Sequence, residues 1–266
     1  MTAGQSSRGL APLAAACLLL AGETIVAQTG TAASARVWIG KEATIEAHLK
    51  SAVVTRMVDI GTGVTKPRRA YLDPQEPVAS LVWKPLAPGM RDGYWESYKS
   101  EIAAYELDRF LDMHVVPPAV ERTVGGESGA AIMWLEGMQS VKQRGGKVPS
   151  GPIWGQAIRR MILFDDLIGN RDRNAGNILI GQPGELILID HSRAFVADTA
   201  LPRELERVDA DLWSRMTALT RADLARAAGR WLDERAIDAM LARRDRMVKD
   251  VEKQVAKKGR ALVIIR

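Results

Sequence analysis

The chain has 266 residues, of which 47% are hydrophobic and 26% charged, an ordinary globular mixture that can build one large domain or two small lobes. Its net charge of +5 comes from dispersed basic residues that are densest near the C-terminus, where acidic residues interrupt them; this favours a solvated helix face over a nucleic-acid site. Cys17 is the only cysteine, which excludes disulfides from the rest of the chain.

Residues 1–27 have the pattern of a secretory signal peptide. Arg8 makes the start modestly positive, residues 10–22 are mostly apolar, and residues 25–27 offer a small-residue cleavage site. This apolar run is too short for a membrane span, which takes about 20 residues. Because the chain also lacks Asn-x-Ser/Thr acceptor sites, we expect an exported or periplasmic bacterial protein without an integral membrane span beyond this segment. A lipobox-like sequence at residues 13–17 leaves anchoring through the N-terminus as the alternative.

A loose linker is predicted for residues 28–44, which are rich in Ala, Thr and Gly. We expect a small lobe over residues 45–137, where the sequence pattern indicates several short strands, and a large lobe over residues 138–266. Gly61 and Gly63 lie at the turn of the first predicted hairpin. Backbone at such a turn can approach phosphate oxygens closely, although a Gly-x-Gly turn is usually only a turn.

A second predicted hairpin turns at residues 125–129, and its return strand ends in Trp134, Leu135 and Glu136 before a glycine. At this point the chain should cross to the large lobe. An apolar connector of this kind is suited to bonding adenine with backbone groups, so we expect these three residues to bind nucleotide.

Lys84 lies on an otherwise apolar predicted strand, where a lysine is costly unless it has a partner. A helix predicted for residues 100–112 places Glu101 near its N-terminus, and Glu106 is the next candidate acid. A pair between Lys84 and Glu101 would fix the ammonium over nucleotide phosphates, with Val82 on the same strand face lining the nucleotide site. The alternative is that Lys84 ends an edge strand and points to water.

Three polar residues have a characteristic spacing in the following lobe: Asn177 comes five residues after Asp172, and Asp190 comes 13 residues after Asn177. Between the last two, a Gly-Gln-Pro-Gly turn separates two short apolar runs, which predicts a hairpin. The hairpin returns Asn177 and Asp190 to one end, where they can supply hard oxygen ligands to a divalent cation. Asp172 is then left to meet a substrate hydroxyl. The alternative is a polar turn that only caps a helix and starts a hairpin.

The large lobe should be mainly helical. A helix before the polar loop ends near Asp165 and Asp166, which we interpret as helix-end polar groups. Further helices are predicted at about residues 205–219, 220–232 and 233–258. The three histidines, His48, His114 and His191, are scattered, which favours structural roles.

A family resemblance is carried by three segments, SEIAAYELDRFLDMHVVPPAV, IGNRDRNAGN and LILIDHSRAF. Together they resemble the secretory-pathway kinases of the Golgi casein kinase type and, more distantly, the HipA-type and phosphoinositide-kinase-like atypical kinases. The resemblance covers roughly residues 53–196. It implies an α+β, two-lobed protein-kinase-like fold, with a small antiparallel-sheet N-lobe containing one helix and a mainly helical C-lobe. It also implies phosphoryl transfer from ATP with Mg²⁺ or Mn²⁺.

The resemblance carries over to individual residues. Lys84 is similar to the phosphate-binding lysine of these kinases, and Glu101 is similar to its helix partner. Asp172 looks like the catalytic aspartate. Asn177 matches a metal or phosphate contact, and Asp190 matches the metal-binding aspartate.

Two features depart from the family pattern. Asn174 stands where many relatives have His, and Asp190-His191-Ser192 replaces the usual D-x-G, which we expect to stiffen the metal loop. The resemblance implies an atypical kinase that phosphorylates a hydroxyl of an unidentified protein, glycan or small molecule. A pseudokinase acting as a nucleotide-binding or interaction module is the first alternative, and a structural envelope protein is the second. The oligomeric state is left open.

Overall fold

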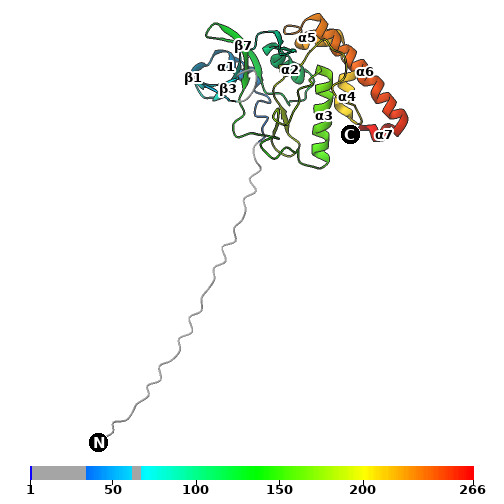
Figure 1. Cartoon of the computed structure of the whole chain (residues 1–266), viewed down its shortest axis with the longest axis horizontal. Coiled ribbons are helices and arrows are strands. Elements are labelled where there is room, and N and C mark those ends of the chain that lie inside the picture. The colour runs from blue at the N-terminus through cyan, green and yellow to red at the C-terminus, as the bar shows by residue number, and fades with distance from the viewer. Residues whose placement is uncertain (2–33, 62–66) are drawn as a thin grey trace. The chain divides into compact units, whose positions relative to one another are not determined.

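The structure is a computed structural model that describes Met1, residues 34–61 and residues 67–266. The expected signal peptide after Met1, the linker up to residue 33, and Gly63 lie outside the described residues. From residue 34 onward a small lobe containing a sheet, drawn in blue to green, is followed by a mainly helical large lobe, drawn in green to red (Figure 1). This is the predicted α+β architecture.

The small lobe is built on a five-stranded antiparallel sheet. Its strands lie in the order β1 (Val53–Asp59), β2 (Arg68–Asp73), β3 (Ser80–Lys84), β7 (Glu127–Met133) and β6 (Ala119–Val124). The strand that carries Lys84 is central, because β2 and β7 flank it on both sides. Lys84 is buried opposite Ala130 of β7, so the alternative of an exposed lysine on an edge strand is wrong.

A helix that the sequence analysis did not predict, α1 (Glu42–Ser51), precedes this sheet. The expectation of a single helix in this lobe is therefore wrong, and the last part of the predicted linker is helical. Ile45 and Leu49 are its only large apolar residues and form a stripe of one turn, too short to stand out as a helical pattern. Both are buried against the sheet together with Trp83.

The predicted helix with Glu101 is α2 (Tyr98–Phe110). It begins earlier than predicted because the Ser97 side chain accepts a hydrogen bond from a first-turn backbone N–H. A short hairpin, which the sequence analysis did not predict, leads into it. Its strands are β4 (Gly89–Arg91) and β5 (Tyr94–Glu96).

The large lobe contains the predicted hairpin, formed by β9 (Ile178–Ile180) and β10 (Leu186–Leu188), with β8 (Gln139–Ser140) alongside β9. The remaining elements are α3 (Pro152–Ile168), β11 (Val208–Asp209), α4 (Ala210–Thr217), α5 (Arg221–Ala228), α6 (Glu234–Lys258), α7 (Arg260–Val263) and β12 (Ile264–Ile265). Within the described ranges, no helix has the length and apolar character needed to cross a membrane.

The end of α3 is fixed just before the polar loop. Gly169 has a positive φ of 68°, a conformation that a side chain would strain, and a Cβ at this position would lie only 2.9 Å from the buried guanidinium of Arg243. Arg243, from α6, donates hydrogen bonds to the carbonyl oxygens of Leu167, Val196 and Asp198. The helices of the large lobe therefore hold both ends of the segment that carries the candidate site.

Candidate active site

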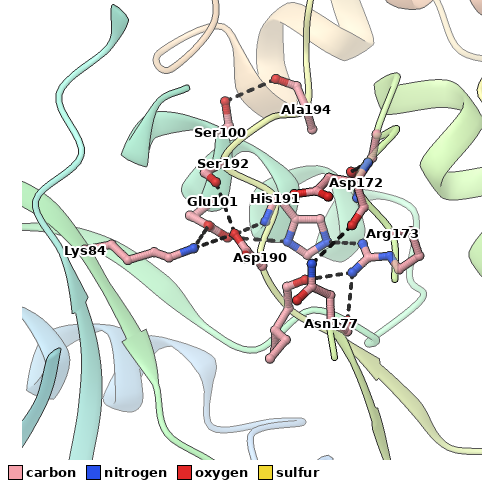
Figure 2. A network of polar contacts seen from close by, with 12 residues as sticks. Lys84, Ser100, Glu101, Asp172, Arg173, Asn177, Asp190, His191, Ser192 and Ala194 are labelled. Atoms are coloured by element: carbon pink, nitrogen blue, oxygen red, sulfur yellow. Dashed lines mark hydrogen bonds and ion pairs between the residues drawn. The ribbon is translucent and has the colours of Figure 1, made fainter. Parts of the chain in front are cut away.

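The predicted pair of Lys84 and Glu101 is present (Figure 2). The Lys84 Nζ lies 2.6 Å from Oε1 of Glu101 and 2.7 Å from Oδ1 of Asp190. The side chains of Lys84 and Glu101 are 6% and 3% exposed, whereas that of Asp190 is 34% exposed. Glu106, the other candidate partner, pairs with Arg109 instead. The central strand, α2 and the loop after β10 therefore meet at one ammonium group.

Burial and charge act in opposite directions on this pair. Burial by itself lowers the pKa of Lys84, but the carboxylates of Glu101 and Asp190 outweigh it and raise the pKa above its ordinary value. Burial likewise favours the neutral form of Glu101, but Lys84 and a hydrogen bond from His191 lower the pKa of this carboxyl well below its usual range. Both partners are therefore charged at neutral pH.

Asp190 has an unusual backbone conformation. Its φ of 60° lies in the left-handed region, which is costly for a residue with a side chain and is concentrated at functional sites. The side chain is held from two directions, because Ser192 Oγ donates a hydrogen bond to the same Oδ1 that contacts Lys84, at 3.1 Å. The backbone strain at Asp190 is thus accompanied by a fixed carboxylate.

His191, the residue after Asp190, links Glu101 to Arg173 (Figure 2). Its backbone N–H donates to Oε2 of Glu101 at 2.9 Å, and its Nε2 lies 2.9 Å from Nη2 of Arg173. Because arginine can only donate, Nε2 is the acceptor and the ring proton is on Nδ1, which faces Glu101 at 3.5 Å. Burial lowers the pKa of His191, so the ring is neutral. These contacts agree with the predicted structural role.

The sequence analysis missed Arg173, the residue after the candidate catalytic aspartate. Its buried guanidinium pairs with the fully buried Asp165 of α3, with an Nη2–Oδ1 distance of 2.9 Å. Its Nη1 donates to the carbonyl oxygens of Asn177 at 2.8 Å and Ile189 at 2.7 Å. Arg173 therefore joins α3, the start of β9 and the segment after β10. The available signal was Asp165 itself, because a buried carboxylate needs a cation.

Asp172 lies on the loop beside this clamp. Its side chain is 42% exposed, and its backbone N–H donates to Oδ1 of Asn170 at 3.1 Å. Asn177 Nδ2 donates to the Asp172 carbonyl oxygen at 3.2 Å, which leaves the amide oxygen of Asn177 as the acceptor. Asn177 and Asp190 are close along the hairpin, because Ile189 N–H donates to the Asn177 carbonyl oxygen at 3.2 Å. The predicted grouping at one end of β9 and β10 is therefore present.

The oxygen atoms of Asn177 and Asp190 are suitable for a hard divalent cation. Among residues 34–61 and 67–266, no group of three or more His, Cys, Asp or Glu side chains could hold a metal by itself. Mg²⁺ typically keeps several waters and takes only one or two protein carboxylates when it is bound together with nucleotide phosphates. One carboxylate and one amide fit that kind of site better than a metal cage made of protein alone.

The other predicted nucleotide-binding residues lie on the small lobe. Gly61 follows β1 and has a positive φ of 73°, and Val82 is half-buried on β3. The backbone N–H of Trp134 donates to the Ser80 carbonyl oxygen at 3.1 Å, and Leu135 is half-buried.

The side chain of Glu136 has polar partners within the small lobe. Its carboxylate accepts hydrogen bonds from Arg69 and from Ser80 Oγ. The guanidinium of Arg69 also lies over the Trp134 ring, 4.4 Å from the ring centroid. The Glu136 carboxylate is thus tied to the small-lobe sheet, which leaves its backbone for the predicted adenine contact.

Comparisons with known proteins support the fold. No protein-family model matches the sequence, and no curated protein matches it. A solved structure of hydra Fam20 with sugar is 19% identical, with a TM-score of 0.70 over 85% of this chain and 92% of the other. A Golgi casein kinase structure is 14% identical, with a TM-score of 0.65 over 84% of this chain and 79% of the other. The Golgi casein kinase with Mn/ADP bound is 13% identical, with a TM-score of 0.65 over 85% and 79%. The chain therefore has the kinase-like fold of Fam20 and the Golgi casein kinase, as the sequence resemblance implies.

Proposed function

We propose that this chain is an atypical kinase that transfers the γ-phosphoryl group of ATP to a hydroxyl of a protein Ser/Thr, a glycan or a small molecule. The observation that carries the proposal is the ammonium of Lys84, which joins Glu101 of α2 to Asp190 of the loop after β10. A lysine that only stabilised the fold would need one carboxylate. A second carboxylate costs free energy unless another cation balances it.

The charges around the site favour a bound cation. Lys84 faces two carboxylates, Glu101 and Asp190, and Arg193 lies between the carboxylates of Glu96 and Asp172. Each group of three has one uncompensated negative charge. In both groups the more exposed carboxylate is the candidate catalytic or metal-binding one. A divalent cation would balance this charge and bring nucleotide phosphates with it.

In this proposal each polar residue has a separate role. The Lys84 ammonium contacts the nucleotide phosphates, and Asn177 and Asp190 hold Mg²⁺ or Mn²⁺, which neutralises phosphate charge when it is bound. Asp172 orients the acceptor hydroxyl and accepts its proton. The acceptor oxygen bonds to the γ-phosphorus, the bond between that phosphorus and the bridging oxygen breaks, and ADP leaves. Adenine and phosphate contacts from Gly61, Gly63, Val82, Trp134, Leu135 and Glu136 remain predictions.

The neighbour structures support this choice of cofactor, since one Golgi casein kinase structure has Mn/ADP bound. We also propose export, on the basis of residues 1–27. N-terminal sequencing should find a mature protein that starts near Gln28, and an intact Met1 on a cytosolic protein would contradict export.

The test is phosphate transfer by the purified protein from ATP labelled at the γ position, with Mg²⁺ or Mn²⁺, to casein and to water. We expect metal-dependent transfer or phosphate release that Asp190→Asn abolishes. Nucleotide binding without turnover would establish the pseudokinase alternative instead. Absence of nucleotide binding would contradict both readings and leave a protein that has only the fold.

A further inference from the structure

Arg193 connects the candidate catalytic aspartate to the hairpin that precedes α2. Its Nη1 lies 3.5 Å from Oδ2 of Asp172, and its Nε donates to Oε1 of Glu96 at 2.8 Å. Its guanidinium also lies over the ring of Tyr94, 4.3 Å from the ring centroid. The planar group therefore has an anchor on one edge, an aromatic face beneath it, and Asp172 on a second edge.

The anchor is a rigid part of the molecule. The Glu96 side chain is buried, and a buried carboxylate is held in place by its cation. The residue after it, Ser97, donates its backbone N–H to the Ser192 carbonyl oxygen at 3.0 Å. The hairpin end is thus joined to the segment after β10 by two contacts, Glu96 with Arg193 and Ser97 with Ser192. Through its ion pair with Asp172, Arg193 connects this fixed segment to the loop that carries Asp172.

Asp172 has little else to hold its carboxylate. Among the residues that the structure describes, the ion pair with Arg193 is the only polar contact of the Asp172 side chain. Without this one contact the half-exposed carboxylate would sample several rotamers, and a misplacement of about 1 Å at a reacting group can reduce a rate by about 10²-fold.

We propose that Arg193 is a positioning residue: it holds Oδ2 of Asp172 so that the other carboxylate oxygen faces the acceptor hydroxyl. This inference rests on the proposed function, since it assigns Arg193 to the acceptor side of that site. It makes the β4–β5 hairpin, through Glu96 and Tyr94, part of the support of the catalytic loop. The competing role is direct contact between Arg193 and the transferred phosphoryl group, and the two roles predict different results in a variant that lacks the Asp172 carboxylate.

The probe is hydrolysis of Mn²⁺·ATP by the full chain, with water as acceptor, measured as release of labelled phosphate. We expect Arg193→Ala to lower kcat by about 10–10²-fold while the KM for ATP stays within about twofold, because positioning of the base is lost and nucleotide binding is kept. Arg193→Lys should restore part of kcat, since it keeps the charge without the planar fork. In an Asp172→Asn background, Arg193→Ala should have no further effect.

Arg226 is a matched control. Like Arg193, it pairs with a carboxylate, that of Asp223, and lies over an aromatic ring, that of Phe110. Unlike Arg193, it lies on α5 and has no polar contact with any candidate site residue that the structure describes. Arg226→Ala should leave kcat unchanged. If Arg193→Ala fails to fold because it leaves the carboxylate of Glu96 buried and unpaired, the double variant with Glu96→Gln removes that charge and should show the same loss of kcat.

Each outcome decides the matter. Unchanged kcat in Arg193→Ala overturns this inference alone, and so does a loss that multiplies with that of Asp172→Asn, which would place Arg193 on the phosphoryl group. A rise in KM for ATP at constant kcat also overturns it. If the wild type neither releases phosphate nor transfers it to casein, the proposed function is overturned, and this inference with it.

Discussion

The contact between Lys84 and Glu101 allows a quantitative test of the small-lobe half of the site. Breaking a buried ion pair by removing one partner costs about 3–5 kcal/mol, because the other charge stays buried. Lys84→Met leaves Glu101 and Asp190 without their ammonium, so we expect a loss of unfolding free energy in that range. Glu101→Gln should cost less, about 1–3 kcal/mol, because Lys84 keeps Asp190 at 2.7 Å.

The pH range of this effect follows from the two pKa shifts. Although burial opposes both, the pair raises the pKa of Lys84 above the ordinary 10.5 and lowers that of Glu101 below the ordinary 4.5. The stabilisation is therefore complete above the unfolded pKa of the glutamate and below the unfolded pKa of the lysine. It is lost only as pH falls through the folded pKa of Glu101 or rises through that of Lys84. The contribution of this pair to the unfolding free energy of the wild type should therefore stay constant from about pH 6 to 9.

Urea unfolding of wild type, both single variants and the double variant provides the measurement, with phosphate transfer in parallel. Each single variant should lose most of its turnover, and the double variant should lose little more than either one. In the unfolding cycle the loss of the double variant should fall short of the sum of the two single-variant losses by at least about 0.5 kcal/mol. Losses that add within experimental error would show that Lys84 and Glu101 do not interact, and would refute the assignment of the pair.

Three further predictions test the large-lobe half. Asp190→Asn should abolish metal-dependent nucleotide binding, whereas Asp172→Asn should keep this binding and cut turnover by about 10²–10⁴-fold. Calorimetric titration of nucleotide with and without Mg²⁺ distinguishes the two variants, and an equal loss of binding in both would refute the two roles. Arg173→Met breaks the buried ion pair with Asp165 and should cost about 3–5 kcal/mol of unfolding free energy. Arg171→Met removes only an exposed ion pair and should cost less than about 1 kcal/mol. Equal losses in urea unfolding would contradict the structural role of Arg173. Burial raises the pKa of Asp108 from 3.8 to about 7, so the folded state holds a proton that the unfolded state releases. Stability from this group is therefore lost as pH rises across that interval. Asp108→Asn should flatten the pH dependence of the urea midpoint between these pH values, and an unchanged slope would refute this prediction.

The parts of the site that sequence predicted have local signals. The hairpin between Asn177 and Asp190 follows from two apolar runs around a glycine-containing turn, and chain geometry then returns both residues to one end. Lys84 stands out because a charged residue on an apolar strand needs a partner, and a helix acid was available nearby. In both cases a local pattern already limits where the side chain can go.

The parts that sequence did not predict depend on distant partners. Arg173 and Arg193 are arginines in a polar loop, and the residues next to them in sequence do not by themselves distinguish them from solvated charges. Their roles come from Asp165 on α3 and from Glu96 on a hairpin 97 residues away in sequence. The helix α1 was missed for a related reason, because its two large apolar residues gain their meaning only from the sheet that buries them.

The departures from the usual metal-loop pattern have a common consequence. His191 and Ser192 stand where a D-x-G loop would have a variable residue and a glycine. The backbone of His191 bonds Glu101, its ring accepts from Arg173, and Ser192 Oγ bonds Asp190. Moving Asp190 out of the site would break these bonds together with its ion pair to Lys84. The protein alone therefore holds the loop in this form, which is the preorganisation that the proposed metal site would require, and control by swinging this aspartate outward is disfavoured.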